Sequence, residues 1–380
     1  MTAIFFSQSA RSDPEGDAQL IAQAIGLKAK GYRPHVLCQA GSSISLLAMQ
    51  AGLRTHYLSF RNALDPSGAI TLAALLRRHR PSAIVCYNSH DTNLCALASH
   101  ALARLGWVKP RPMLIRMRNH LHGTAKAFTH NALLDHTYVS SDTLRDRVLR
   151  DSGVLAHKVS VLYPALDVGQ IVQRSNAALP AVLECAVSDL SQRPLIAHVQ
   201  PVDLDSGHVF MLEVLAGAVK THPGLRYMVM RSGPHCDALA QAAKRWGLGA
   251  HLLWVDPPCD TEALLKRADV VVLPAHRTAQ DSSAIVAMAL GVPLIASDVG
   301  QITEFVQSGK TGRLCLAPHE PGALANWLEA LLDTLGNPTR AQALAKAGQR
   351  ALVQQLGPGQ HLEVLLHGIH TMRLDQGSAP

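Results

Sequence analysis

Short apolar runs, separated by longer stretches of mixed polarity, recur along the whole chain. In the first half, runs bounded by turn residues predict buried strands at 3–6, 35–38, 84–87, 113–116, 136–139 and 159–162. Leu20, Ala24 and Leu27 share one face at helical spacing, which predicts a helix over about 17–30. Strands that alternate with helices indicate a parallel sheet covered by helices.

The same alternation starts again after a stretch without clear periodicity at 168–193. A second series of strands is predicted at 194–199, 226–230, 251–255, 270–273 and 293–296, followed by helices at 321–335, 339–356 and 361–373. Two doubly wound domains of this kind bind ligands where the carboxyl ends of their strands lead into loops.

Composition supports this α/β class and narrows the cellular setting. The 380 residues are 48% hydrophobic but only 4% aromatic, which favours parallel sheets over a β-sandwich or a disordered chain. No run of 18 apolar residues occurs, and residues 1–10 lack the features of a secretion signal, so we expect a cytoplasmic protein. Seven scattered cysteines without a CxxC spacing indicate reduced thiols.

Positive charge is concentrated in the first half of the chain. Residues 1–170 contain 19 Lys and Arg against 10 Asp and Glu, whereas the remainder contains 16 and 18. A basic half predicts an anionic partner such as phospholipid head groups, a lipid diphosphate or a phosphorylated glycan. Nucleic acid is less favoured because no nucleic-acid-binding motif is present and aromatic residues are scarce. Simple solubility is a further interpretation of the excess charge.

The segment 268–312 carries the most specific motif. It combines a buried strand ending at Pro274, a helix opening near Asp281, a second strand at 293–296 and a turn closing on Gly312. A loop from a strand end to a helix N-terminus presents backbone N–H groups to an anion. The segment resembles the donor-sugar segment of retaining, GT-B-type glycosyltransferases of family 4.

This resemblance implies two Rossmann-like domains facing a central cleft: an acceptor domain at 1–167, a linker at 168–193 and a donor domain at 194–356. Residues 357–380 are then expected to hold a helix that crosses back to the first domain, followed by a frayed tail. The implied reaction transfers a sugar, with retention and without a metal or cofactor, from a nucleotide-sugar or lipid-linked donor. The implied acceptor is a surface glycan such as lipopolysaccharide, or a lipid-linked glycan at the inner membrane surface.

Three segments of the first domain match the family pattern. His90 follows a predicted strand where the family has a histidine-containing loop, and Arg118 and His120 fall in a segment similar to its R-x-R-H motif. Residues 162–167 resemble the family's hinge. His90, Arg118 and His120 are therefore catalytic candidates, although loop histidines without a special role are an alternative. We expect Arg116 and Arg118 to point to opposite faces of their strand.

The donor domain departs from the family at charged positions. The loop 198–208 resembles a family loop that carries an Arg and a Lys, but Pro201 and Ser206 occupy those positions. Two glutamates of the family, eight residues apart, are here Thr278 and Val286. The missing cations would neutralise the nucleotide diphosphate as the glycosidic bond breaks, and such charge stabilisation is a main source of rate.

A rebuilt phosphate site is one interpretation of these changes. Arg277 is the preferred cation and the fourth catalytic candidate, with His276 and Arg231 as further sources of positive charge. The helix that follows offers hydroxyl and N–H groups at its N-terminus, although simple capping is an equal alternative for Ser282 and Ser283. The donor-binding candidates are Gly16, Ser206, Arg231, Gly233, Asp281, Ser282, Ser283 and Ala284.

Two other functions stay open. Loss of the residues that grip the donor fits a non-catalytic scaffold or regulator of an active glycosyltransferase. Isomerases and phosphorylases share the same architecture, and fold alone does not decide among them. Asp203 and Asp205 form a D-x-D pair, but their loop indicates a solvated turn, so no metal site is expected there.

Overall fold

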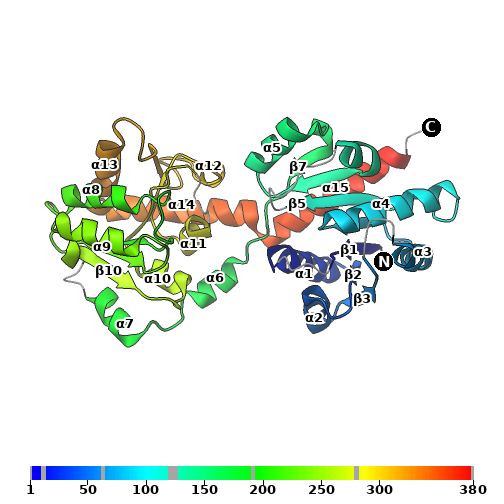
Figure 1. Cartoon of the computed structure of the whole chain (residues 1–380), viewed down its shortest axis with the longest axis horizontal. Coiled ribbons are helices and arrows are strands. Elements are labelled where there is room, and N and C mark those ends of the chain that lie inside the picture. The colour runs from blue at the N-terminus through cyan, green and yellow to red at the C-terminus, as the bar shows by residue number, and fades with distance from the viewer. Residues whose placement is uncertain are drawn as a thin grey trace. The chain divides into compact units, whose positions relative to one another are not determined.

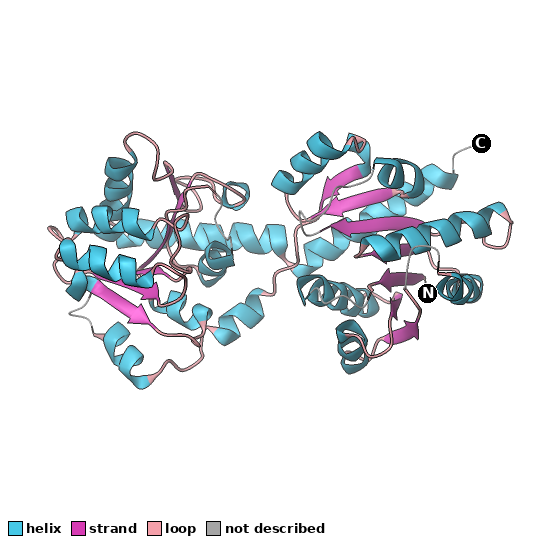
Figure 2. Cartoon of the chain, viewed as in Figure 1, coloured by secondary structure: helices cyan, strands magenta, loops and turns pink. Residues whose placement is uncertain are grey.

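The computed structural model describes residues 2–9, 14–60, 65–118, 127–189, 193–277 and 282–377. The chain divides into two compact units, the first made of Met1–Leu166 and Leu356–Pro380 and the second of Asp167–Gln355. Each unit contains one parallel sheet with helices packed on its faces (Figures 1 and 2). This arrangement confirms the predicted α/β class with two Rossmann-like domains.

The sheet of the first unit has the strand order β3-β2-β1-β4-β5-β6-β7. Its strands are Ala3–Ser7 (β1), Arg33–Cys38 (β2), Arg54–Tyr57 (β3), Ala83–Cys86 (β4), Met113–Arg118 (β5), His136–Val139 (β6) and Val159–Val161 (β7). The strand order reverses between β1 and β4, and ligands of such sheets bind outside the carboxyl ends of strands at this switch point. The edge strand β3, which the apolar pattern did not predict, has no fully buried residue.

The helices of the first unit are Pro14–Ala29 (α1), Ser43–Gln50 (α2), Pro66–His79 (α3), Ser89–Arg104 (α4), Asp142–Ser152 (α5) and Pro358–Gly377 (α15), with short turns at Thr129–Leu133 (η1) and Ala156–Lys158 (η2). Side chains alternate across the sheet, so Ile4 and Phe6 pack towards α1 and α15 while Phe5 packs towards α3 and α4. Burial on both faces explains why β1 reads as a continuous apolar run.

Helix α15 belongs to the first unit although it follows the second unit in sequence. A Cβ on Gly26 of α1 would overlap the side chain of Leu362. Nε2 of His361 lies 2.7 Å from the Gln23 amide nitrogen, and its Nδ1 lies 2.7 Å from the carbonyl oxygen of Tyr163. The small residue in α1 and the paired polar groups together hold the C-terminal helix against the first sheet.

The second sheet has the order β10-β9-β8-β11-β12-β13, with its switch point between β8 and β11. Its strands are Leu195–His198 (β8), Arg226–Met230 (β9), Leu252–Val255 (β10), Val270–Leu273 (β11), Leu294–Ser297 (β12) and Arg313–Cys315 (β13). The edge strand β13 was not predicted, because only one of its three residues is buried.

The helices of the second unit are Val168–Arg174 (α6), Ala181–Ser188 (α7), His208–Ala218 (α8), Cys236–Arg245 (α9), Thr261–Arg267 (α10), Ser282–Leu290 (α11), Ile302–Phe305 (α12), Ala323–Gly336 (α13) and Pro338–Leu356 (α14), with a short turn at Gly249–His251 (η4). The segment 168–193, expected as a linker, thus holds two helices, and α6 packs against α10 and α11. Ile171 is the one buried residue of α6, too few to give a periodic pattern. None of the helices in the described ranges is long and apolar enough to span a bilayer.

Candidate functional site

Backbone contacts join the loops that follow β8 and β11. Gly207 has a φ of 74°, and a Cβ there would overlap the carbonyl oxygen of Pro274. The N–H of His276 donates to the carbonyl oxygen of Asp205 at 2.9 Å. Glycine adopts this conformation without strain and allows two backbones to approach so closely. The two loops therefore form a single platform at the switch point of the second sheet.

The loop after β9 is joined to the same platform. The N–H of Val202 donates to the carbonyl oxygen of Ser232 at 2.7 Å. Gly233, a predicted donor-binding residue, has a φ of 100°, and a Cβ there would overlap the backbone of Val202. The close approach of the Val202 backbone and the positive φ therefore account for a glycine at position 233, independently of any ligand.

Asp203 folds the turn between β8 and α8. Its Oδ1 accepts from the N–H groups of Asp205 at 3.0 Å and Ser206 at 2.7 Å. The Ser206 hydroxyl donates to the Asp203 carbonyl oxygen at 2.9 Å, and its oxygen lies 2.7 Å from Nδ1 of His208. These bonds agree with the interpretation of the D-x-D pair as a turn, and they commit the predicted donor-binding Ser206 to the protein itself.

Two buried histidines, His198 and His208, stack beneath this turn. Their ring centroids are 3.6 Å apart and the planes differ by 4°. Nδ1 of His198 lies 2.6 Å from the hydroxyl oxygen of Tyr227. Burial lowers the pKa of His208 to about 4 and that of His198 well below its usual range, so both rings are neutral near pH 7. In the sequence these two histidines appear only as the first and last residues of the loop 198–208, with nothing to indicate that their rings stack.

Arg231 forms an ion pair and a cation–π contact at the edge of the second sheet. Its Nε lies 2.8 Å from Oδ1 of Asp256, and its guanidinium carbon lies 4.9 Å from the ring centroid of Trp254. The ion pair and the cation–π contact both direct the charge towards β10. Arg231 therefore already has a carboxylate partner, which the sequence did not indicate.

The loop after β11 holds the other charged candidate. Arg277 is exposed, and no ion-pair partner for its guanidinium occurs within the described ranges. Beside it, burial and then the neighbouring His319 lower the pKa of His276, whose ring centroid lies 6.1 Å from that of His319. His276 is therefore neutral near pH 7, and Arg277 carries the positive charge of this loop.

The predicted residues at the start of α11 differ in exposure. Ser282 is exposed, whereas Ser283 and Ala284 are buried. Ala284 is fully buried, so its side chain packs in the core and does not face a ligand. Asp281 and Thr278, like His120 in the first unit, lie outside the described residues.

A polar network lies at the switch point of the first sheet. The side-chain amide of Gln8 donates to Oδ1 of Asp17 at 3.0 Å, and the hydroxyl of Ser43 donates to Oδ2 at 2.6 Å. Asn88 Nδ2 donates to the Gln8 side-chain oxygen at 2.7 Å. Gly16, predicted to bind the donor, is buried in the first turn of α1, next to Asp17. The network joins the loops after β1, β2 and β4, and its members were not among the predicted site residues.

Asp91 is a buried carboxyl group that sequence reasoning also missed. Its Oδ2 accepts from the N–H of Ser9 at 2.7 Å, and its Oδ1 has no hydrogen-bond partner among the described residues. Burial raises the pKa of Asp91 to about 7, against the opposing effects of Arg116 and the Ser9 N–H. The neighbouring candidate His90 is exposed in the first turn of α4.

Arg116 and Arg118 lie on the same face of β5, so the expectation of opposite faces was wrong. Residues two apart on a strand share a face. Nη1 of Arg116 donates to the hydroxyl of Thr92 at 3.1 Å, and both arginines help to lower the pKa of the buried His130 to about 4, after the larger effect of burial. Burial also lowers the pKa of Arg118 itself. His130 was not among the predicted residues.

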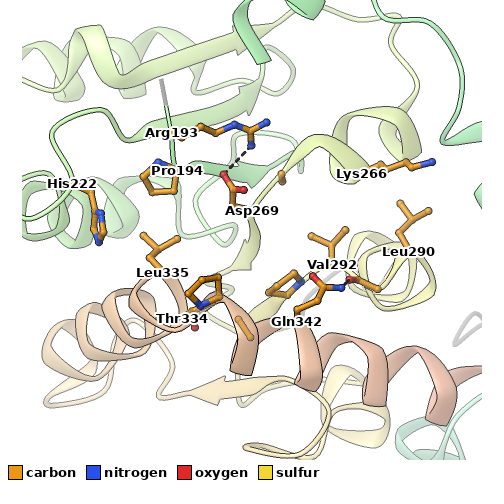
Figure 3. Close-up of a pocket in the computed structure, with 15 residues that line it drawn as sticks. Arg193, Pro194, His222, Lys266, Asp269, Leu290, Val292, Thr334, Leu335 and Gln342 are labelled. Carbon is orange, nitrogen blue, oxygen red and sulfur yellow. Dashed lines mark hydrogen bonds and ion pairs between the residues drawn. The ribbon is translucent and has the colours of Figure 1, made fainter. Parts of the chain in front are cut away.

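A pocket of about 570 Å³ lies at the amino ends of the strands of the second sheet, opposite the strand-end loops described above. Arg193 and Asp269, which line it, lie just before β8 and β11 (Figure 3). Pro293, which also lines it, directly precedes β12. The Arg193 guanidinium binds Oδ2 of Asp269 at 2.8 Å. This pocket contains none of the predicted site residues.

Part of the second unit matches a known protein family. Residues 193–334 match the family model described as glycosyl transferases group 1. Glycogen synthase of Mycobacterium tuberculosis (strain CDC 1551 / Oshkosh) is 31% identical over 159 residues, which cover 41% of this chain and 37% of that protein. The chain thus matches well under half the length of this curated relative.

Solved structures are similar over nearly the whole chain. A glycosyltransferase from Rickettsia africae aligns over 98% of each chain with a TM-score of 0.72 and 13% identity. Anabaena Alr3699/HepE, crystallised in complex with UDP, aligns over 98% of this chain and 100% of its own with a TM-score of 0.68 and 15% identity. At such identities the likeness establishes the fold, and it confirms the GT-B architecture.

Proposed function

We propose that the chain is a divergent glycosyltransferase that moves a sugar from a nucleotide-sugar donor to an anionic glycan or lipid-linked acceptor. The match of residues 193–334 to glycosyl transferases group 1 carries this proposal. The matched residues include the loops after β8, β9 and β11, and strand-end loops at a switch point are where such sheets bind ligands. A uridine nucleotide is the first donor to test, because HepE was crystallised with UDP.

Arg277 and the start of α8 are the parts of the donor loops suited to a diphosphate. Helix α8 begins directly after Gly207, and no side-chain hydrogen bond caps its N-terminus within the described ranges. Its first backbone N–H groups therefore present a partial positive charge. Arg277 adds a full charge on the adjoining loop. Stabilising the charge on the leaving diphosphate is the role that these groups would share. We place no metal in this step, because the Asp203 carboxylate is used in its own turn.

The first unit is proposed to bind the acceptor. The excess of Lys and Arg in residues 1–170 suits a phosphorylated glycan, such as a lipopolysaccharide core, or the anionic inner surface of a membrane. His90 is exposed at the carboxyl edge of the first sheet, where a sugar hydroxyl could reach it. Arg118, half-buried on β5, and His120 complete the proposed acceptor side.

A non-catalytic scaffold is the second candidate. It is favoured because Ser206, which stands in place of the family's Lys, is bonded within its turn, and because Arg231, a possible source of the missing charge, is paired with Asp256. Thermal unfolding in the presence of UDP, GDP, CMP and their sugars separates the two functions. A nucleotide that binds the folded chain raises the melting temperature. A rise that Arg277→Ala removes, and the exposed control Arg245→Ala keeps, supports the transferase; no rise across the panel supports the scaffold.

A further inference from the structure

Three histidines meet on one face of the first sheet, away from the loops discussed above. His35 lies on β2, His56 on β3 and His79 is the last residue of α3. Nδ1 of His35 is 2.8 Å from Nε2 of His56, and one nitrogen from each of the three rings lies within 4.8 Å of the others. The His35 and His79 ring centroids are 4.5 Å apart.

Strand register and the direction of α3 bring these rings together. His56 pairs with Leu37, and His35 lies two residues before Leu37 on β2, so both histidines share the face that α3 covers. Because α3 runs back along the sheet, its last turn lies over the amino halves of the strands. The cluster is therefore separate from the carboxyl ends of β1 and β4.

The cluster is partly buried. Imidazole nitrogens are among the commonest protein ligands of transition-metal ions. His35 is fully buried, whereas His56 and His79 are partly exposed, which leaves one side open to solvent.

We propose that His35, His56 and His79 form a binding site for a divalent transition-metal ion, with zinc as the ion of choice. Three imidazoles and one open position match the ligand set that zinc accepts, and tetrahedral coordination with bonds of about 2.0–2.1 Å places nitrogens about 3.3 Å apart. Nδ1 of His35 lies 2.8 Å from Nε2 of His56, and the three ligand nitrogens lie within 4.8 Å of one another, so side-chain rotation is needed to bring all three onto one ion. Arg33 and Arg54, which flank the cluster on β2 and β3, favour hydroxide or another small anion as the fourth ligand.

The bound ion would cross-link the edge strand of the first sheet to its neighbours. β3 is a short edge strand, and a shared ion would link it to β2 and to the end of α3. Binding to the folded chain alone raises thermal stability. The site is independent of the proposed sugar transfer.

Calorimetric titration of the tag-free chain with zinc chloride tests the proposal. We expect one equivalent to bind saturably, to raise the melting temperature, and to have no counterpart with magnesium. His79→Ala removes a partly exposed ligand and should weaken binding at least about 100-fold, since loss of a mere partner of a metal ligand already costs about 10–100-fold. His56→Ala should act in the same way.

His157→Ala is the matched control, because it removes an exposed histidine far from the cluster in sequence. It should leave the zinc affinity unchanged. Circular dichroism confirms that each variant is folded. The proposal is overturned if the wild-type chain binds no stoichiometric zinc, or if His79→Ala and His56→Ala bind zinc as tightly as His157→Ala does.

Discussion

The imidazole rings of His198 and His208 stack face to face, with centroids 3.6 Å apart, and join the end of β8 to the start of α8. His198 is further bound to the Tyr227 hydroxyl and His208 to the Ser206 hydroxyl. The stack thus lies between the sheet and the turn that Asp203 and Ser206 form. The geometry of that turn depends on two neutral rings.

Removing one ring should destabilise the second unit. His208→Ala leaves a cavity beside His198 and takes the partner from Ser206, so we expect the free energy of unfolding to fall by about 2–4 kcal/mol. Urea denaturation measures this change. A loss below about 0.5 kcal/mol, the range of an ordinary surface substitution, would show that the stack does not support the turn.

The same histidine should make stability sensitive to mild acid. The pKa of His208 in the folded chain is about 4, below its ordinary value of 6.5. The unfolded chain therefore binds the proton first, so the stability from the neutral ring is complete above pH 6.5 and is lost as the pH falls towards 4. Other histidines with a lowered pKa act in the same direction, among them His198, His35, His130 and His136. The test is thus the difference between the wild-type chain and His208→Leu, which should shrink between pH 7 and pH 4.5; a constant difference would contradict the prediction.

Arg277 should contribute to turnover. If it stabilises the leaving diphosphate, Arg277→Ala lowers donor turnover by about tenfold or more, and Arg277→Lys keeps part of the rate because the charge remains. Initial rates with the best nucleotide-sugar measure the effect. Unchanged rates in Arg277→Ala would remove this residue from the site.

Arg231 should matter much less than Arg277. Its guanidinium already pairs with Asp256 and stacks on Trp254. Arg231→Ala is expected to lower turnover by less than about threefold and to change stability by no more than about 1 kcal/mol, as for other half-exposed ion pairs. A loss of rate as large as that of Arg277→Ala would show that Arg231 leaves Asp256 to bind the donor.

Gly207 and Gly309 offer a matched pair of positive-φ glycines. Alanine at either position adopts a left-handed conformation, which costs about 1–2 kcal/mol. At Gly309 nothing lies within 4 Å of the added Cβ, whereas at Gly207 the Cβ overlaps Pro274. We expect Gly207→Ala to lose a further 1–3 kcal/mol, roughly, from overpacking. Equal losses for the two variants in chemical denaturation would mean that the loops after β8 and β11 are not held together as described.

Most of the fold could be predicted because buried parallel strands are continuous apolar runs. The strands β1, β4 and β11 were predicted for this reason, while β3 and β13 were missed because edge strands bury few residues. Helix α6 was missed in a similar way, since Ile171 is its only buried residue.

The site was less predictable because its contacts join residues distant in sequence. Ser9 meets Asp91 and Arg231 meets Asp256 only once neighbouring strands have paired. Exchanged family residues such as Ser206 were visible in the sequence, but their new hydrogen bonds were not. The resemblance thus indicated which loops carry the candidate residues, whereas strand register and packing determine what each side chain contacts.

Calorimetric titration of the intact chain with UDP, GDP and CMP tests the central claim most directly. A donor platform built from the loops after β8, β9 and β11 predicts saturable binding of one nucleotide at one site per chain, weakened in Arg277→Ala and unchanged in Arg245→Ala. The absence of binding by any of the three nucleotides and by their sugars, with the chain shown to be folded, would contradict a glycosyltransferase and leave the scaffold as the function.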